Sequence, residues 1–276
     1  MTTTTTELAN RSKEYRKKIL KYIYGAGAGH TGGSLSCVDI LNVLYNHVLN
    51  VSPDNFKSPD RDRYIQSKGH TVEALYVVLA DKGFFPEDDL KTLCKYQSHY
   101  IGHPTKKVNG VEQNTGALGH GLPIAVGNAI AAKMDDKKYR VFTLLGDGEL
   151  PEGSNWEAAL TAAHYKLDNL CAIIDHNKLQ ISGTTAEVCN TSPIDSKFES
   201  FGWAVKHVDG HDFDELIRTF DSLPFTDGKP SLILAHTVKG KGISFMENQL
   251  SWHHGVPDAK QFEIAMQELD KEIKVL

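Results

Sequence analysis

The sequence predicts an α/β fold, in which a doubly wound, mostly parallel sheet carries helices on both faces. Short apolar runs alternate with longer segments of helical periodicity along the 276 residues, which is typical of parallel strands connected by helices. Two of these runs, 141–145 and 170–174, consist mainly of apolar residues, as expected for strands that are buried on both faces. The length allows one large domain with a substantial core.

The expected elements follow one another along the whole chain. Strands are expected at 62–66, 141–145, 170–174, 203–208 and 231–236. Helices are expected at 8–24, 36–49, 72–82, 86–96, 122–134, 154–166, 212–222 and 258–274. Pro86 followed by three acidic residues is typical of a helix start. No linker rich in proline, glycine or serine divides the chain, so we expect residues 1–276 to form a single domain with residues 1–8 as a flexible leader.

Composition argues against several classes of protein. The formal net charge is -5 and there is no long basic run, which argues against binding to nucleic acid. No apolar stretch approaches the roughly 20 residues that span a bilayer, and the amino terminus has no signal-peptide pattern. The four cysteines are too widely scattered to suggest a metal site. We therefore expect a cytoplasmic protein, with Cys171 as a buried free thiol.

The most informative motif is Gly146-Asp147-Gly148, which follows the first of the two apolar runs, while Asn177 follows the second. Because the carboxyl ends of parallel strands meet at the edge where ligands bind in open α/β sheets, we expect Asp147 and Asn177 to lie close together. A hard cation such as Mg²⁺ takes oxygen ligands and is usually shared with phosphates, and a glycine lets the backbone approach a phosphate. The pattern predicts a metal ion carrying a diphosphate, with a structural turn as the alternative.

Four of the 13 histidines stand beside glycines in expected loops, namely His30, His70, His103 and His254. A histidine framed by glycine gains exposure and backbone freedom, which catalysis uses and a core does not require. An imidazole donates hydrogen bonds or exchanges protons near neutral pH. From the residues alone, a structural role for any one of the four is equally open.

Two other patterns suggest sites that we do not expect. Residues 27–32 satisfy the dinucleotide fingerprint Gly-x-Gly-x-x-Gly, but that fingerprint needs a preceding strand, and the preceding segment is helical in character. The glycines instead indicate the end of a helix and a loop that presents His30. His99 and His103 have the spacing of zinc ligands on a helix, but Pro104 argues against a helix there.

Eight motifs in order give the chain a resemblance to the transketolases, within the thiamine-diphosphate enzymes, over residues 10–256. They are Gly29-His-Thr-Gly-Gly-Ser34, Ser67-Lys-Gly-His70, Gly102-His-Pro104, Thr115-Gly-Ala-Leu-Gly-His-Gly121, Gly146-Asp-Gly148, Asp175-His-Asn-Lys-Leu-Gln-Ile181, Thr237-Val-Lys-Gly-Lys-Gly242 and Trp252-His-His-Gly255. The resemblance implies the cofactor thiamine diphosphate with Mg²⁺, for which Mn²⁺ or Ca²⁺ can substitute. It also implies the thiamine-diphosphate-binding fold.

The same resemblance implies roles for individual residues. The catalytic histidines would be His30, His70, His103 and His254. The cofactor would be bound by His70, Gly116, Leu118, Asp147, Gly148, Asn177, Ile181 and His254. The metal would be held by the side chains of Asp147 and Asn177 and the backbone carbonyl of Leu179. One departure is His120, which stands where many transketolases have glutamine.

The resemblance also implies a missing part. In transketolases the glutamate that activates the cofactor belongs to a second, pyrimidine-binding domain, whereas this chain ends about twenty residues after His254. We therefore predict the N-terminal subunit of a two-piece transketolase, whose C-terminal subunit supplies that glutamate in an α₂β₂ heterotetramer. Glu152 and Glu157, which the residues alone place at a solvated helix start, are then expected at the subunit interface. Residues 237–242 are consistent with a plain basic loop, but the resemblance implies that they close over the active site.

The predicted reaction is the reversible transfer of a two-carbon ketol unit from a ketose phosphate to an aldose phosphate. In carbohydrate metabolism this fits the pentose phosphate pathway or the catabolism of a branched or modified sugar. One alternative is the α-type subunit of a 2-oxo-acid dehydrogenase, which shares the Gly-Asp-Gly and Asn motif but does not need the four histidines. The other alternative is a non-catalytic regulatory module that binds the cofactor.

Overall fold

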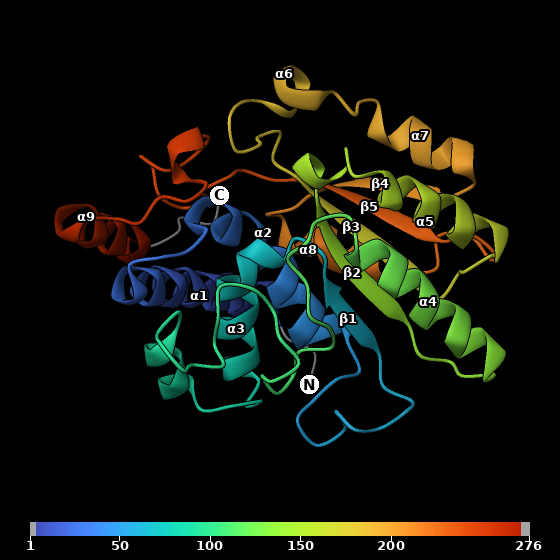
Figure 1. Cartoon of the computed structure of the whole chain (residues 1–276), viewed down its shortest axis with the longest axis horizontal. Helices are drawn as coiled ribbons and strands as arrows, with labels where there is room; N and C mark the ends of the chain where they lie inside the picture. The colour runs from blue at the N-terminus through green and yellow to red at the C-terminus, as the bar shows by residue number, and fades with distance from the viewer. Residues whose placement is uncertain (1–3, 272–276) are drawn as a thin grey trace.

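A five-stranded parallel sheet forms the centre of the computed structural model, which describes residues 4–271 (Figure 1). Its strands are β1 (Arg63–Gln66), β2 (Val141–Gly146), β3 (Leu170–His176), β4 (Ala204–Asp209) and β5 (Ser231–His236). The strand order is β1-β2-β3-β5-β4, and every neighbouring pair is parallel. All five expected strands are present, and the predicted α/β class is confirmed.

Helices cover both faces of the sheet. The α-helices are α1 (Thr5–Ala26), α2 (Thr31–Val43), α3 (Val72–Asp81), α4 (Gly121–Met134), α5 (Gly153–His164), α6 (Thr185–Cys189), α7 (Ile194–Phe201), α8 (Phe213–Asp221) and α9 (Ala259–Asp270). One core lies between the sheet and α1, α2, α3 and α8, and a second lies between the sheet and α4, α5 and α7 (Figure 1). On β2, Phe142 and Leu144 join the first core while Val141 and Leu145 join the second. This two-sided burial explains why the strand is so apolar.

Two expectations about helices are wrong. Residues 86–96 do not form an α-helix, because a 3₁₀ segment (Glu87–Thr92) is followed by a turn in which Cys94 and Gln97 have positive φ. The expected leader is wrong for residues 4–8, since Thr4 caps α1 in a capping box with Glu7 and Leu8 is completely buried. Residues 1–3, and the end of the expected helix 258–274 beyond residue 271, lie outside the described residues.

Two short helices were not expected. α6 and α7 lie between β3 and β4, where the sequence has no long amphipathic period. The start of α6 carries a capping box formed by Thr184 and Glu187, which is a signal that the sequence contains. Within residues 4–271, no helix combines the length and apolar character needed to cross a membrane. The four cysteines are free, and Cys171 is buried as predicted.

The start of α2 places His30 at a helix end. α1 ends at Gly27 in the left-handed conformation, with φ 66°, so a helix and not a strand precedes residues 27–32. α2 begins at Thr31, earlier than expected, and His30 is its N-cap residue. The helix then continues into a π-helical turn (Leu44–Val48). The expectation that the glycines end a helix and present His30 is confirmed.

Candidate active site

A cavity of about 170 Å³ lies at the carboxyl ends of β2 and β3. Every residue predicted to bind cofactor or metal lines this cavity, and so do three of the four predicted histidines. The fourth, His103, stands beside the cavity, because its ring lies against Gly116 and its centroid is 6.1 Å from that of His30. The tertiary fold thus brings all of the predicted site residues to one place.

The adjacent strands β2 and β3 set the geometry of the sheet edge. Their register pairs Gly146 with Asp175, so the residues that follow the two strands meet. The Asp147 carboxylate accepts a hydrogen bond from the backbone N–H of Lys178 at 2.5 Å. It accepts a second from the N–H of Gly148 at 2.8 Å. The loop after β3 is therefore tied directly to the motif after β2.

The oxygen atoms at this edge fit a hard divalent cation. Asp147 is only 2% exposed, and among residues 4–271 no lysine or arginine forms an ion pair with it. Burial, followed by the nearby Asp175 carboxylate, raises the pKa of Asp147 to about 6. The buried side-chain oxygen of Asn177 accepts the N–H of Leu179 at 3.1 Å. A buried, uncompensated carboxylate beside an amide oxygen and a turning backbone is a donor set that suits Mg²⁺.

A buried ion pair between Lys68 and Asp175 lies next to the sheet edge. Asp175 also accepts hydrogen bonds from the hydroxyl of Ser36 at 2.6 Å and from that of Thr237. Burial opposes both charges, but their attraction raises the pKa of Lys68 and lowers the pKa of Asp175. The Lys68 ammonium therefore stays charged in the cavity wall, where it can also donate a hydrogen bond to an anionic ligand.

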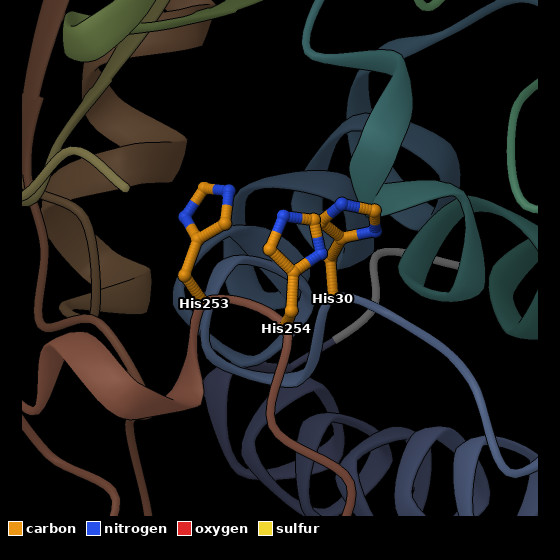
Figure 2. A group of neighbouring side chains, drawn as sticks. All are labelled: His30, His253 and His254. Carbon is orange, nitrogen blue, oxygen red and sulfur yellow. The ribbon is translucent and has the colours of Figure 1, made fainter. Parts of the chain in front are cut away.

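The imidazoles of His30, His70, His253 and His254 meet in the same cavity and form what we call the histidine wall. The ring centroid of His30 lies 4.2 Å from that of His254, 5.1 Å from His70 and 5.6 Å from His253. Figure 2 shows that His253 and His254 come from one segment near the C-terminus and that the His254 ring lies between those of His253 and His30. His253 was missed, because the motif Trp252-His-His-Gly255 offers two neighbouring histidines and only the second was chosen.

Most of these imidazoles are neutral at pH 7. Burial, and then the neighbouring His254, lower the pKa of His30 to about 4. Burial, and then Lys239, lower the pKa of His253 to about 3. Burial also lowers the pKa of His70 well below its ordinary range, with Lys68 as the next cause. A neutral imidazole has one donor and one acceptor nitrogen, so the wall suits a ligand rich in hydroxyl groups.

The histidine wall is a poorer site for a metal ion than the sheet edge. Nitrogen atoms of His30, His253 and His254 lie within 4.8 Å of one another, which is close enough for a shared ion. However, Lys239 Nζ lies 2.9 Å from His253 Nδ1. Burial and the nearby Lys68 lower the pKa of Lys239 to about 8, which still leaves it mostly charged at pH 7. Two ammonium groups at one cavity oppose a second cation there.

The loop at residues 115–121 is held against the cavity by a buried acid. Glu149, 1% exposed, accepts the N–H of Gly119 at 2.9 Å and a hydrogen bond from the hydroxyl of Ser67. Gly116 has φ 137°, and a Cβ at this position would lie 2.5 Å from the ring of His103. Glu149 was not predicted as part of the site, although it follows the Gly-Asp-Gly motif directly.

A buried network anchors the loop after β5, which carries Lys239 to the cavity. The Asp39 carboxylate accepts two hydrogen bonds from Arg16, at 2.7 and 2.9 Å, and one from His211 Nδ1 at 2.7 Å. His211 Nε2 in turn accepts the backbone N–H of Val238 at 2.9 Å. Burial opposes the charge of Asp39, but Arg16 and then His211 hold the pKa of this carboxyl well below its usual range.

Three remaining predicted residues lie on the surface. Glu152 and Glu157 are exposed around the start of α5. Leu160 on the same helix is 57% exposed. His120 is exposed at the N-cap of α4, where its Nδ1 lies 3.1 Å from the carbonyl oxygen of Leu118. His120 does not line the cavity, so its link to the site runs through Leu118.

Comparison with known proteins places these features in a family. The family model described as the transketolase thiamine diphosphate binding domain matches residues 11–270. The chain is 50% identical over 266 residues to one of the subunits of the apulose-4-phosphate transketolase of Phocaeicola vulgatus, covering 96% of this chain and 95% of that relative. It is 40% identical over 267 residues to the 6-deoxy-6-sulfo-D-fructose transketolase subunit SqwG of a Clostridium species, covering 96% and 97%.

Solved structures show the same likeness. The transketolase of Campylobacter jejuni superposes with a TM-score of 0.89 at 31% identity and covers 95% of this chain. This chain corresponds to only 43% of that transketolase. It therefore spans less than half the length of the solved protein that it matches.

Proposed function

This chain belongs to the transketolase family, and we propose that it is the cofactor-binding subunit of a two-subunit transketolase. In this proposal the enzyme transfers a two-carbon ketol unit from a ketose phosphate to an aldose phosphate. The observation that carries the proposal is that one cavity brings the oxygen atoms of Asp147 and Asn177 together with a group of imidazoles that includes His30. A module that only bound diphosphate would not need these imidazoles.

Thiamine diphosphate and a divalent cation would occupy the sheet edge. Asp147, Asn177 and the backbone carbonyl of Leu179 would hold Mg²⁺. Lys68 and Lys239, which line the same cavity, would favour the negative charge of the diphosphate. Leu118 and Ile181, which also line the cavity, would contact the apolar parts of the cofactor. When bound, the cofactor supplies the electron sink for cleaving the carbon–carbon bond of the ketose.

The histidines of this chain would bind the sugar and move its protons. His30 and His254, whose rings lie 4.2 Å apart, would accept and return a proton at the sugar hydroxyls beside the reacting carbon. His103, whose ring centroid lies 6.1 Å from that of His30, would bind the ketose by a hydrogen bond. His70 lies near Lys68 in the cavity and would contact the diphosphate.

A second chain would complete the site. The two relatives named as apulose-4-phosphate transketolase subunits match this chain over nearly their whole length, which supports a single domain here and a separate partner chain. By the family resemblance, that partner supplies the activating glutamate in an α₂β₂ assembly. The exposed side chains around and on α5, including Glu152, Glu157 and the apolar Leu160, would contribute to the contact.

The donor sugar would be an unusual ketose. Two relatives carry names that specify apulose 4-phosphate, and a third specifies 6-deoxy-6-sulfofructose. Identity is greater with the apulose-4-phosphate proteins, so we propose a branched ketose phosphate as the preferred donor. The ketose phosphates of the pentose phosphate pathway are the competing choice.

Reconstitution with the partner chain tests the function. The isolated chain, the product of the neighbouring gene as the candidate partner, and their mixture are each assayed with thiamine diphosphate and Mg²⁺. The donors are apulose 4-phosphate, 6-deoxy-6-sulfofructose and xylulose 5-phosphate, each with an aldose phosphate as acceptor, and pyruvate is assayed in parallel. We expect ketol transfer from the mixture alone. Normal turnover by the isolated chain would show that the two-subunit proposal is wrong. Turnover of pyruvate in place of sugars would favour a 2-oxo-acid dehydrogenase.

A further inference from the structure

A buried carboxyl behind the histidine wall is used by no step described so far. Glu73 lies in the first turn of α3 and is 1% exposed. Within residues 4–271 it forms no ion pair, and its side-chain partners are a backbone N–H and a hydroxyl. Burial raises the pKa of Glu73 to about 7. Burying a carboxyl without a cation lowers stability, and such groups beside cavities are candidates for function.

Glu73 holds the first turn of α2. Its Oε1 accepts the backbone N–H of His30 at 3.3 Å, and its Oε2 accepts the hydroxyl of Ser34 at 2.8 Å. His30 is the N-cap residue of α2 but makes no capping hydrogen bond with its own side chain. The Glu73 carboxyl, on α3, therefore accepts hydrogen bonds from polar groups at the start of α2. When it is ionised, its negative charge also complements the dipole of α2.

This contact constrains the backbone from which the His30 imidazole projects. Glu73 accepts the N–H of His30 itself, so the contact acts on the residue that carries the imidazole. The ring centroid of His30 lies 5.1 Å from that of His70 and 4.2 Å from that of His254. Figure 2 shows how closely the His30 and His254 rings approach. A small rotation of the turn would move the imidazole out of this arrangement, and a displacement of about 1 Å can cost roughly 100-fold in rate.

α3 makes a matching contact with a second histidine segment. The hydroxyl of Tyr76, one turn beyond Glu73, donates to the backbone carbonyl of His103 at 3.3 Å. Glu73 and Tyr76 thus contact the backbones of two different predicted catalytic histidines from one helix. This pair provides matched variants, since each removes one contact to a histidine backbone and leaves both histidines in the sequence.

We propose that Glu73 is a positioning residue for His30, which it orients by accepting the His30 N–H and the Ser34 hydroxyl. The proposal rests on the proposed function, in which His30 exchanges a proton with the sugar. It adds a residue that touches neither cofactor nor substrate and acts through the start of α2.

The first test uses Glu73→Ala and Glu73→Gln in the two-chain enzyme. We expect Glu73→Ala to lower kcat about 10- to 100-fold, with the Kd for thiamine diphosphate and the KM for the ketose changed by less than about twofold. Glu73→Gln keeps an oxygen for the His30 N–H and an amide that can donate to Ser34, so it should restore most of kcat. The control Tyr76→Phe should act on the KM for the ketose through His103 and leave kcat near normal.

A double-mutant cycle separates positioning from a general structural role. In a His30→Ala background, Glu73→Ala should cause little further loss of kcat, because its effect travels through His30. Additive losses, a weakened cofactor affinity or a failure of Glu73→Gln to rescue kcat would overturn the proposal. If Glu73→Ala does not fold, Ser34→Ala removes one of the two contacts and should reproduce part of the kcat loss with the same non-additivity.

A measurement without turnover keeps this proposal separate from the proposed function. The ring ¹⁵N signals of His30, assigned by comparison with His30→Ala, are recorded by NMR in the isolated chain. Glu73→Ala should shift these signals, whereas Glu73→Gln should leave them near their original positions. Unshifted signals in Glu73→Ala would overturn the positioning role. Absence of ketol transfer by the native two-chain enzyme would overturn the proposed function alone.

Discussion

The two walls of the cavity are built in different ways. On the sheet edge, Asp147 and Asn177 follow neighbouring parallel strands, so backbone hydrogen bonds between β2 and β3 set their separation. On the histidine wall, His30 and His254 come from opposite ends of the chain. No shared strand register places them, and side-chain contacts between helices and loops do so instead. The comparison shows that one site can combine a part set by secondary structure with a part set by packing.

The buried acids that support the two sides also differ. Asp175, beside the sheet edge, has Lys68 as a partner, and Asp39, below the loop of Lys239, has Arg16. Glu73, behind His30, has no ion pair among the described residues. A buried acid that is paired with a lysine or an arginine keeps that partner in place while both are ionised. An uncompensated one costs stability where it ionises, so the ionisation of Glu73 should lower the stability of the folded chain.

The largest expected effect is the loss of cofactor binding at the sheet edge. Asp147→Ala removes the carboxylate that we propose as the ligand of the cation, so Mg²⁺-dependent binding of thiamine diphosphate should be abolished while the fold is retained. Titration calorimetry with the cofactor and Mg²⁺ measures this, with circular dichroism as the check on folding. Asp88→Ala, at a side chain that is 79% exposed, is the control and should bind normally. An unchanged affinity in Asp147→Ala would reject the metal assignment.

The next effect is on turnover and should follow position in the histidine wall. His30→Ala and His254→Ala should each lower kcat about 100- to 10,000-fold, because one acid–base group contributes about that much. His103→Ala should mainly raise the KM for the ketose, and His70→Ala should mainly weaken cofactor binding. Steady-state kinetics of the two-chain enzyme measures these values, with exposed His99→Ala as the control. Near-normal kcat in both His30 and His254 variants would remove their catalytic role.

A third effect concerns Asp39, the buried acid that is paired with Arg16. Asp39→Asn leaves Arg16 buried without its carboxylate, and breaking a buried pair in this way costs about 3–5 kcal/mol. Because His211 is released as well, the loop after β5 should become more mobile, and hydrogen exchange at the Val238 amide should accelerate. Urea unfolding and exchange mass spectrometry measure the two changes. Asp136→Asn, at a side chain that is 94% exposed, should change neither, and equal behaviour of the two variants would refute the anchoring role.

The smallest effect is on the pH dependence of stability and concerns Glu73, which has no ion pair among the described residues. The pKa of Glu73 in the folded chain is about 7 and its ordinary value is 4.5, so between these pH values the folded state keeps a proton that the unfolded state has lost. Stability therefore falls as pH rises from about 4.5 to 7, by an amount on the order of 2–3 kcal/mol. Glu73→Gln removes this loss. The free energy of unfolding of the variant should therefore exceed that of the native chain by more at pH 8 than at pH 5. An equal difference in free energy of unfolding at both values would contradict the assignment.

The sequence by itself determined the class of fold, the five strands and the sheet edge of the cavity. Apolar runs separated by helical periods are local signals, and buried parallel strands leave few other arrangements. Once two such strands are neighbours, the residues after their carboxyl ends lie at the same edge, which is why Asp147 and Asn177 were found together as expected. The four glycine-framed histidines and the order of the eight motifs indicated the transketolase family, which the family match confirms.

Only the tertiary structure decided which polar residues are buried and what they contact. His253, Lys239 and Glu149 lie within or beside quoted motifs, yet their places in the cavity wall depend on loops that approach from distant parts of the chain. Glu73 looks like an ordinary acid at a helix start, and its burial depends on α2 covering it. Local sequence patterns do not record these contacts, because burial and hydrogen bonding are properties of residues that become neighbours only after the chain has folded.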